Sequence, residues 1–212
     1  MATLWSSFLP YIQPYVPGCP EIIIEAHLQE AAAEFCARSE VWRYDIEQDF
    51  TSKGTSDYEI DVPKKAVLEN ILVLYLNGSA LSSVSDRHYD LPSTATSAAP
   101  CYYSIYQDSQ IRFYPTPDKS YNFEGVGVLK PQLDATGVED FIFQTHGRCI
   151  SYGAIAKLAI IPGKEWSNPD IASYYQTKFH MEADIAKGRD TRRVNLRVKP
   201  AGFDSVTARR GI

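Results

Sequence analysis

The first strong apolar pattern of the chain is helical. Pro20 suits the first turn of a helix, and Glu21 and Glu25 suit its positive end. One face is formed by residues that recur at spacings of three and four: Ile24, Leu28, Ala31, Ala32, Phe35, Cys36 and Ser39. The pattern predicts a helix over about 20–40. Residues 1–18 predict a short helix broken at Pro10, Pro14 and Pro17, because proline lacks the N–H donor of a helix interior.

Between Val41 and Pro131 the period changes to the alternation that is typical of strands. Apolar and polar residues alternate over 42–48 and 58–62, and a nearly continuous apolar run over 67–76 suits a central strand. Asn77-Gly78 then predicts a tight hairpin, because both central positions of that turn take positive φ.

A second hairpin is predicted at Asp108-Ser109, between strands over 102–106 and 110–114, and a further strand over 121–129. The Ser-, Thr- and Ala-rich stretch 93–100 reads as a surface loop. Several short strands separated by turn residues predict a small antiparallel sandwich or barrel.

Helical spacing returns after Val138, where one face is predicted to hold Phe141, Thr145, Cys149, Tyr152, Ala156 and Ala159. Small residues at 147, 151, 153 and 154 would let a second helix approach closely. Pro162-Gly163 ends this helix, and Asn168-Pro169 starts another with a capping side chain. The last helix continues to about 190 through Ile171, Tyr174, Tyr175, Lys178, Phe179 and Glu182.

The order of elements predicts an α+β fold. Residues 1–40 and 138–190 form a discontinuous helical bundle, into which a small antiparallel β-sandwich or barrel, residues 41–137, is inserted. Residues 191–212 form an extended basic C-terminal arm.

Charge is distributed unevenly along the 212 residues, whose net charge is −5. From Lys187 onward the chain carries eight basic and two acidic residues, a charge of +6, which leaves −11 for residues 1–186. The basic residues are Lys187, Arg189, Arg192, Arg193, Arg197, Lys199, Arg209 and Arg210. An acidic body with a basic arm argues against nucleic-acid binding over the whole surface and favours an arm that meets a negative partner.

The arm has two interpretations. Arg189, Arg192, Arg193 and Arg197 lie on one side if the helix continues, and guanidinium groups bind carboxylates or phosphates bidentately. Alternation of Val194, Leu196 and Val198 with polar residues suggests an extended segment that could join a partner's sheet, with Phe203 and Val206 as anchors. The alternative is a solvated helix end whose charges offset the helix dipole.

Catalytic, cofactor and metal sites are not predicted. His27 with Glu30 and Glu34 is the best arrangement for a metal, but an exposed acidic helix face gives the same pattern. Asp86-Arg87-His88 reads as a polar loop, and Glu139-Asp140 as a helix start. Gly125-Val126-Gly127 lies in a predicted strand and lacks the third glycine of a phosphate loop.

Four cysteines stand far apart and are expected to be free, mostly buried thiols of an intracellular product: Cys19, Cys36, Cys101 and Cys149. Residues 1–18 have neither the basic lead of a signal peptide nor the apolar run of a membrane span.

Several segments together resemble the head-to-tail adaptor, or head-completion, proteins of tailed bacteriophages, particularly short-tailed ones. They are Cys19-Pro20 with Ala31-Ala32 and Phe35-Cys36, Asn77-Gly78 with Leu81, 111–118, Lys130-Pro131, 162–169 and the Arg-rich helix with its basic tail. The resemblance extends over nearly the whole chain through the order and spacing of these segments.

The resemblance implies a non-enzymatic virion protein in the neck between head and tail, present in the host cytoplasm during assembly. It implies a ring of identical subunits, a dodecamer, which binds the portal protein and a tail tube or nozzle protein, and tail fibres as a further possible partner. DNA would pass only transiently, and no membrane is involved. The expected portal-binding residues are Arg189, Arg192, Arg193, Arg197, Lys199, Phe203, Arg209 and Arg210.

Two other classes stay open. A tail-fibre, receptor-binding or neck structural module would use Tyr102, Tyr103 and Tyr106 as a sugar platform, although strand packing explains the same residues. A cell-wall hydrolase would need paired carboxylates facing a cleft, and the sequence offers no such pair.

Overall fold

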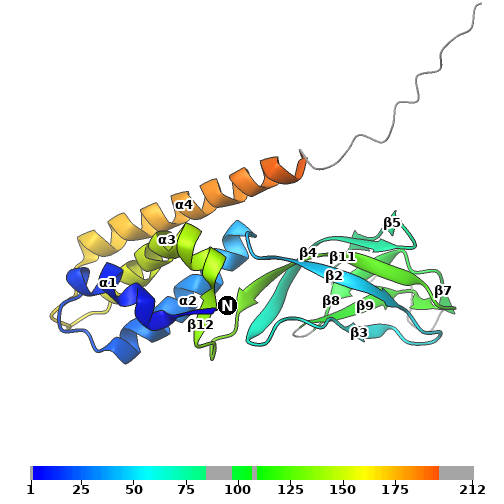
Figure 1. Cartoon of the computed structure of the whole chain (residues 1–212), viewed down its shortest axis with the longest axis horizontal. Helices are drawn as coiled ribbons and strands as arrows, with labels where there is room; N and C mark the ends of the chain where they lie inside the picture. Colours follow the sequence, from blue (N-terminus) through cyan, green and yellow to red (C-terminus); the bar gives the residue numbers. More distant parts are fainter. Residues whose placement is uncertain (1, 85–96, 107–108, 196–212) are drawn as a thin grey trace, which may run out of the picture.

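The computed structural model describes residues 2–84, 97–106 and 109–195, with the backbone alone at 48 and 190–195. Helices gather at one end of the elongated molecule and the two larger sheets at the other (Figure 1). The first long helix, α2 (Glu21–Ser39), packs with α3 (Asp140–Ala159) and α4 (Pro169–Asn195), so elements from opposite ends of the sequence lie side by side. The α+β fold class predicted from the sequence is confirmed.

The predicted face of α2 is the buried one. All seven residues identified by their spacing are buried, from Ile24 to Ser39. The helix ends where Glu40 takes a left-handed conformation (φ 54°) and its N–H bonds to the Cys36 carbonyl. The helix over about 20–40 is therefore confirmed to within one residue at each end.

The N-terminal segment differs from the prediction. It begins with strand β1 (Ala2–Leu4) and continues through η1 (Trp5–Phe8), α1 (Leu9–Ile12) and η2 (Gln13–Tyr15). Pro10 does not break the helix but lies in the first turn of α1, where no N–H donor is needed. Strand β1 pairs with β12 (Gly137–Glu139), which precedes α3.

The first of the two larger sheets has the order β2-β11-β4-β5. Its strands are β2 (Arg43–Phe50), β11 (Asn122–Pro131), β4 (Ala66–Leu76) and β5 (Ser79–Ala80). The long apolar run forms a central strand, as predicted, because β4 pairs with β11 along most of its length and with β5 on its other side.

The second sheet has the order β3-β9-β8-β6. Its strands are β3 (Asp57–Glu59), β9 (Gln110–Tyr114), β8 (Tyr102–Ile105) and β6 (Ser82–Ser83). A separate parallel pair joins β7 (Ser97–Ala98) to β10 (Thr116–Pro117), so part of the stretch predicted as a surface loop is a strand. Residues 93–96 of that stretch lie outside the described residues.

Both predicted hairpins are confirmed by strand pairing. At the first, Asn77 (φ 47°) and Gly78 (φ 79°) take positive φ between β4 and β5. At the second, β8 and β9 pair in antiparallel register, with Ser109 at φ 63°. Turn chemistry therefore predicted the first connection correctly, whereas Asp108 of the second lies outside the described residues.

Aromatic rings fill the space between the two larger sheets. Tyr58 from β3, Phe113 from β9 and Phe123 from β11 meet edge to face, with ring centroids 5.5 to 5.8 Å apart. Such tilted contacts are the preferred geometry of aromatic pairs. They join one sheet to the other.

The predicted face of α3 is wrong in its first half. Phe141 is 46% exposed and Thr145 is also exposed, whereas Ile142 is fully buried. The reason is that α1, β1 and β12 contact this helix in addition to α2 and α4, so its buried side changes along its length and a single stripe does not describe it. Helix α4 also reaches Asn195, so residues 191–195, expected in the arm, are helical.

Candidate partner-binding surface

Helix α4 is fixed to the helical body by Phe179. This ring is fully buried and packs over Gly153 of α3, where a Cβ would lie 2.9 Å from two ring carbons and 3.1 Å from the Cβ of Ala31. The predicted role of the small residues in α3 is therefore confirmed at Gly153. Because only glycine leaves room for the ring, the distance between α3 and α4 is set here.

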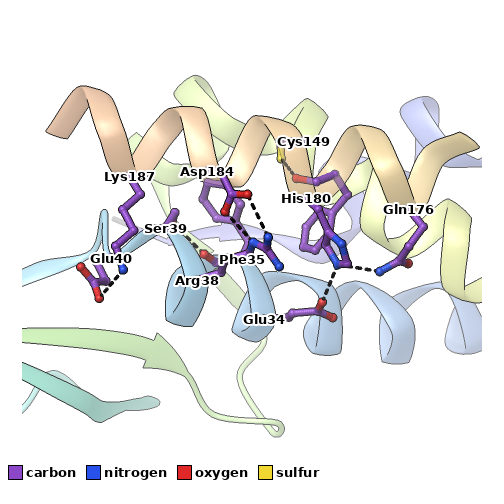
Figure 2. Close-up of polar contacts among 11 residues, drawn as sticks. Glu34, Phe35, Arg38, Ser39, Glu40, Cys149, Gln176, His180, Asp184 and Lys187 are labelled. Carbon is purple, nitrogen blue, oxygen red and sulfur yellow. Dashed lines mark hydrogen bonds and ion pairs between the residues drawn. The ribbon is translucent and has the colours of Figure 1, made fainter. Parts of the chain in front are cut away.

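A row of polar contacts fixes the position of α4 against α2 (Figure 2). The His180 Nε2 lies 2.7 Å from the Gln176 side chain and 3.4 Å from Glu34. One and two turns further, Arg38 donates to both carboxylate oxygens of Asp184, and the Lys187 Nζ donates to Glu40 at 2.8 Å. We call these pairs the α2–α4 polar row. The partners are spaced by about one turn along α4, whereas on the other side Glu34 and Arg38 are one turn apart and Glu40 directly follows the end of α2. Contacts along two turns of α4 also set its rotation.

Local contacts and burial determine the protonation states of Asp184 and of two buried thiols in this region. The hydrogen bonds from Arg38 hold the pKa of Asp184 below its ordinary value, and the positive charge adds to the effect. Burial raises the pKa of both the Cys36 and Cys149 thiols to about 12, so these thiols stay protonated at neutral pH. The four cysteines are free, as predicted, and Cys101 is the exposed one.

The opposite side of α4 exposes large apolar groups. Tyr174 is 57%, Met181 53% and Ile185 45% exposed, and Lys178 lies between them on the same face. The Lys178 Nζ lies 5.5 Å from the centre of the Tyr174 ring. We call these four residues the outer face of α4. Helical spacing in the sequence predicted this helix but did not identify its outer face.

A tyrosine cluster lies at the N-terminal end of α4. The Tyr175 ring lies 5.3 Å from Tyr15, 5.2 Å from Tyr152 and 5.1 Å from Tyr174, measured between centroids. Burial and the contact with Tyr15 raise the pKa of Tyr175, so this ring is neutral near pH 7. Tyrosines from three separate segments meet here, which helical spacing within one segment could not reveal.

Only part of the predicted basic site falls within the described residues. Arg189 is exposed on α4, and Arg192 and Arg193 lie in its last turns. Arg197, Lys199, Phe203, Arg209 and Arg210 lie outside the described residues. The expectation that these residues form one binding site stays a prediction.

The other residues weighed as sites have structural partners. The His27 Nδ1 lies 3.5 Å from Glu30, while Glu34 binds Lys157 at 3.0 Å. Asp140 accepts a hydrogen bond from the Thr3 hydroxyl at 2.6 Å. Gly125 and Gly127 lie in β11, as predicted. In the described part of the chain no group of three or more His, Cys, Asp or Glu residues could hold a metal ion. Asp86-Arg87-His88 lies outside it.

The tyrosines of the β8–β9 hairpin do not form one exposed platform. Tyr103 is only 3% exposed, and its hydroxyl points toward the Ile71 carbonyl. The Tyr106 ring is covered by the guanidinium of Arg112, 3.9 Å from its centre. Tyr102 alone is exposed among the large apolar groups of this strand. The hairpin residues therefore serve mainly in packing.

Comparison with known proteins identifies a family whose model matches most of the chain. The model of a family described as SU10 adaptor protein matches residues 5–200. A search of curated proteins gives no match to the chain. Within the residues that the structure describes, no helix is both long and apolar enough to span a membrane.

Proposed function

The chain belongs to the SU10 adaptor protein family of phage structural adaptors, and we propose that it forms a ring that joins the portal of a capsid to the tail. In this proposal the phage is short-tailed, the ring surrounds the path of the DNA, and the protein has no enzymatic activity. The outer face of α4 is the observation that supports the assembly of a ring.

The outer face suits a protein interface because its apolar groups are exposed on a rigid support. Phe179 and the α2–α4 polar row hold α4 to the body, so little ordering is required when a partner binds. Tyr and Met are enriched in the buried centres of interfaces. A copy of the chain that packs a different surface against this face makes a head-to-tail contact, and such contacts form a ring when the rotation between neighbouring copies closes.

Portal binding is proposed for the basic end of α4 and the residues beyond it. The outer part of α4 carries Arg189, Arg192 and Arg193 in its last two turns. Arginine side chains bind carboxylates with two parallel hydrogen bonds, so an acidic surface on the portal is the expected partner. The direction of α4, away from η2 and past the end of α2, carries this end beyond the helical body (Figure 1).

The acidic body suits a ring through which DNA passes. Residues 1–186 carry a charge of −11, and a negative channel wall repels the phosphate backbone. Repulsion keeps the DNA from adhering to the wall, and salt weakens it.

The test is the size of the assembly that the full chain forms with a candidate portal protein, measured by sedimentation velocity. We expect a ring of many copies on the portal. The double variant Met181→Ser/Ile185→Ser should stay monomeric or bind as scattered single subunits. A matched control is Ile160→Ser, since Ile160 is 67% exposed and lies outside the outer face.

Two outcomes would refute the proposal. Ring assembly of the Met181→Ser/Ile185→Ser variant at wild-type concentration would remove the outer face as the subunit interface. A trimer that ignores the portal would instead support the tail-fibre class.

A further inference from the structure

A groove begins between β2 and β3, at the free edges of the two larger sheets, and continues beyond the end of β3 beside Ala66 and Val67 of β4. It consists of two hollows of about 280 and 560 Å³ that share Glu59, Ile60 and Asp61 in their walls. Apolar side chains form its floor, namely the buried Ile46, Ile60 and Phe123. In the described part of the chain β2 pairs only with β11 and β3 only with β9, so each strand keeps one open edge.

The rim of the groove is acidic and lacks basic partners. Glu47, Asp49, Glu59 and Asp61 line it and are all exposed. None of these four carboxylates has a Lys, Arg or His partner among the described residues. Two neighbouring acidic residues do have basic partners, since Asp57 binds Arg112 and Glu69 binds Lys130.

The electric field of these carboxylates also acts on a side chain inside the groove. The pKa of Tyr44, which lines the first hollow, is raised by burial and then by the charges of Asp61 and Glu47. Its hydroxyl donates to the Asp61 carbonyl at 2.8 Å. A positive group placed between these carboxylates would be stabilised by the same field.

An open strand edge, an apolar floor and an acidic rim together suit an extended segment that carries both apolar and basic side chains. The residues beyond α4 have this composition. Over 196–212, which we call the tail segment, there are four basic residues and one acidic residue. Its larger apolar residues are Leu196, Val198, Phe203 and Val206.

The tail segment is long enough to reach the groove of its own chain. Lys187 is bound to Glu40, and Asn195 follows eight residues later, about 12 Å along the helix at 1.5 Å per residue. Ile46 lies six residues beyond Glu40, at most about 20 Å along an extended chain. With about 10 Å more for the Lys187–Glu40 contact itself, the separation is at most about 40 Å. The 17 residues of the tail segment span up to about 56 Å.

We propose that the acidic groove between β2 and β3 binds the tail segment of the same chain. A tethered segment is present at an effective concentration in the millimolar range, so it outcompetes the tail of a second copy at micromolar concentration. The inference goes beyond the proposed adaptor function. Those portal-binding residues that belong to the tail segment have a resting site, from which a portal must displace them. Docking in the groove does not itself depend on the portal.

Limited trypsin digestion of the full chain tests this proposal, with cleavage after Arg209 followed by mass spectrometry. A synthetic peptide of residues 196–212 gives the unprotected rate. We expect cleavage in the chain to be at least about tenfold slower than in the peptide. The variant Glu47→Gln/Asp49→Asn/Glu59→Gln/Asp61→Asn should approach the rate of the peptide, as should the wild-type chain in about 0.5 M salt.

The matched control neutralises four exposed acids outside the groove, Glu21→Gln/Glu124→Gln/Glu165→Gln/Asp170→Asn, and should keep the protection. Equal cleavage rates in the wild-type chain and the groove variant would overturn the proposal. Protection that rises with chain concentration would assign the groove to a second copy and would also overturn it. No portal is present, so a failure of portal binding does not alter the result.

Discussion

Arg38 and Asp184 form a bidentate ion pair between helices that lie 146 residues apart in the sequence, with N–O distances of 2.7 and 2.9 Å. The pair joins the first long helix to the last one and lies in the middle of the α2–α4 polar row (Figure 2). Both side chains are substantially exposed, so solvent screens their attraction, and the pair's main effect is on the position of α4.

A pH titration should detect this pair. The pKa of Asp184 is lowered in the folded chain, so its contribution to stability is complete above the ordinary carboxylate pKa and is lost as the pH falls through the folded value. We expect NMR titration of the Asp184 carboxyl carbon to give a midpoint below that of an ordinary aspartate. The Arg38→Gln variant should raise the midpoint toward the ordinary value, and an unchanged midpoint would show that the pair does not form in solution.

Packing between α3 and α4 predicts opposite effects at two helix glycines. Gly153→Ala should destabilise the fold by about 1–3 kcal/mol, because the new methyl group meets the Phe179 ring and Ala31. Gly188→Ala is the matched control, since no atom lies within 4 Å of the position that its methyl group would take, and it should stabilise by about 0.5–1 kcal/mol. Urea unfolding measures both, and a neutral Gly153→Ala would contradict the close packing.

The β4–β5 turn predicts a cost for any β-branched residue at Gly78. Gly78→Val should destabilise by about 1–2 kcal/mol, because a β-branched residue resists a φ of 79°. Gly78→Asn should cost much less, since asparagine tolerates this region. Thermal melting compares the two variants, and equal melting temperatures for wild type and Gly78→Val would show that the turn is different in solution.

Thiol reactivity should separate the four cysteines. Cys101 is exposed, whereas burial raises the pKa values of Cys19, Cys36 and Cys149. With Ellman's reagent at pH 8 we expect one rapid equivalent from Cys101, with the other three released only on unfolding. The Cys101→Ser variant should lose the rapid phase, and a second rapid thiol in that variant would contradict the burial.

Some elements were predictable because residues close together in the sequence determine their structure. Spacing alone identified every buried residue of α2, since one side of that helix packs and the other is exposed. Asn77-Gly78 and Asn168-Pro169 each determine their own backbone, and the Asn168 side chain indeed accepts a hydrogen bond from the Ile171 N–H at 3.1 Å. Turns and caps of this kind need no knowledge of the rest of the fold.

Other features could not be predicted because they depend on distant partners. The exposed position of Phe141 depends on which side of α3 is covered by its neighbours α1, α2, α4, β1 and β12. The short strands β1 and β12 form only by pairing with each other, 135 residues apart. In the candidate surface, Met181 and Ile185 are exposed because the face of α4 that carries Phe179 packs against the helical body. Helical spacing in the sequence is compatible with more than one buried face of this helix.

The most direct test of the central claim is portal binding by two forms of the chain, full-length and truncated after Asn195. Sedimentation with purified portal protein measures the amount bound, and circular dichroism confirms that the truncated chain keeps its helices. The account predicts that the full chain binds as a ring, that truncation weakens binding by at least about tenfold although Arg189, Arg192 and Arg193 remain, and that Arg192→Glu/Arg193→Glu weakens it most at low salt. Native affinity of the truncated chain would contradict the account, because the portal contact would then lie on the helical body.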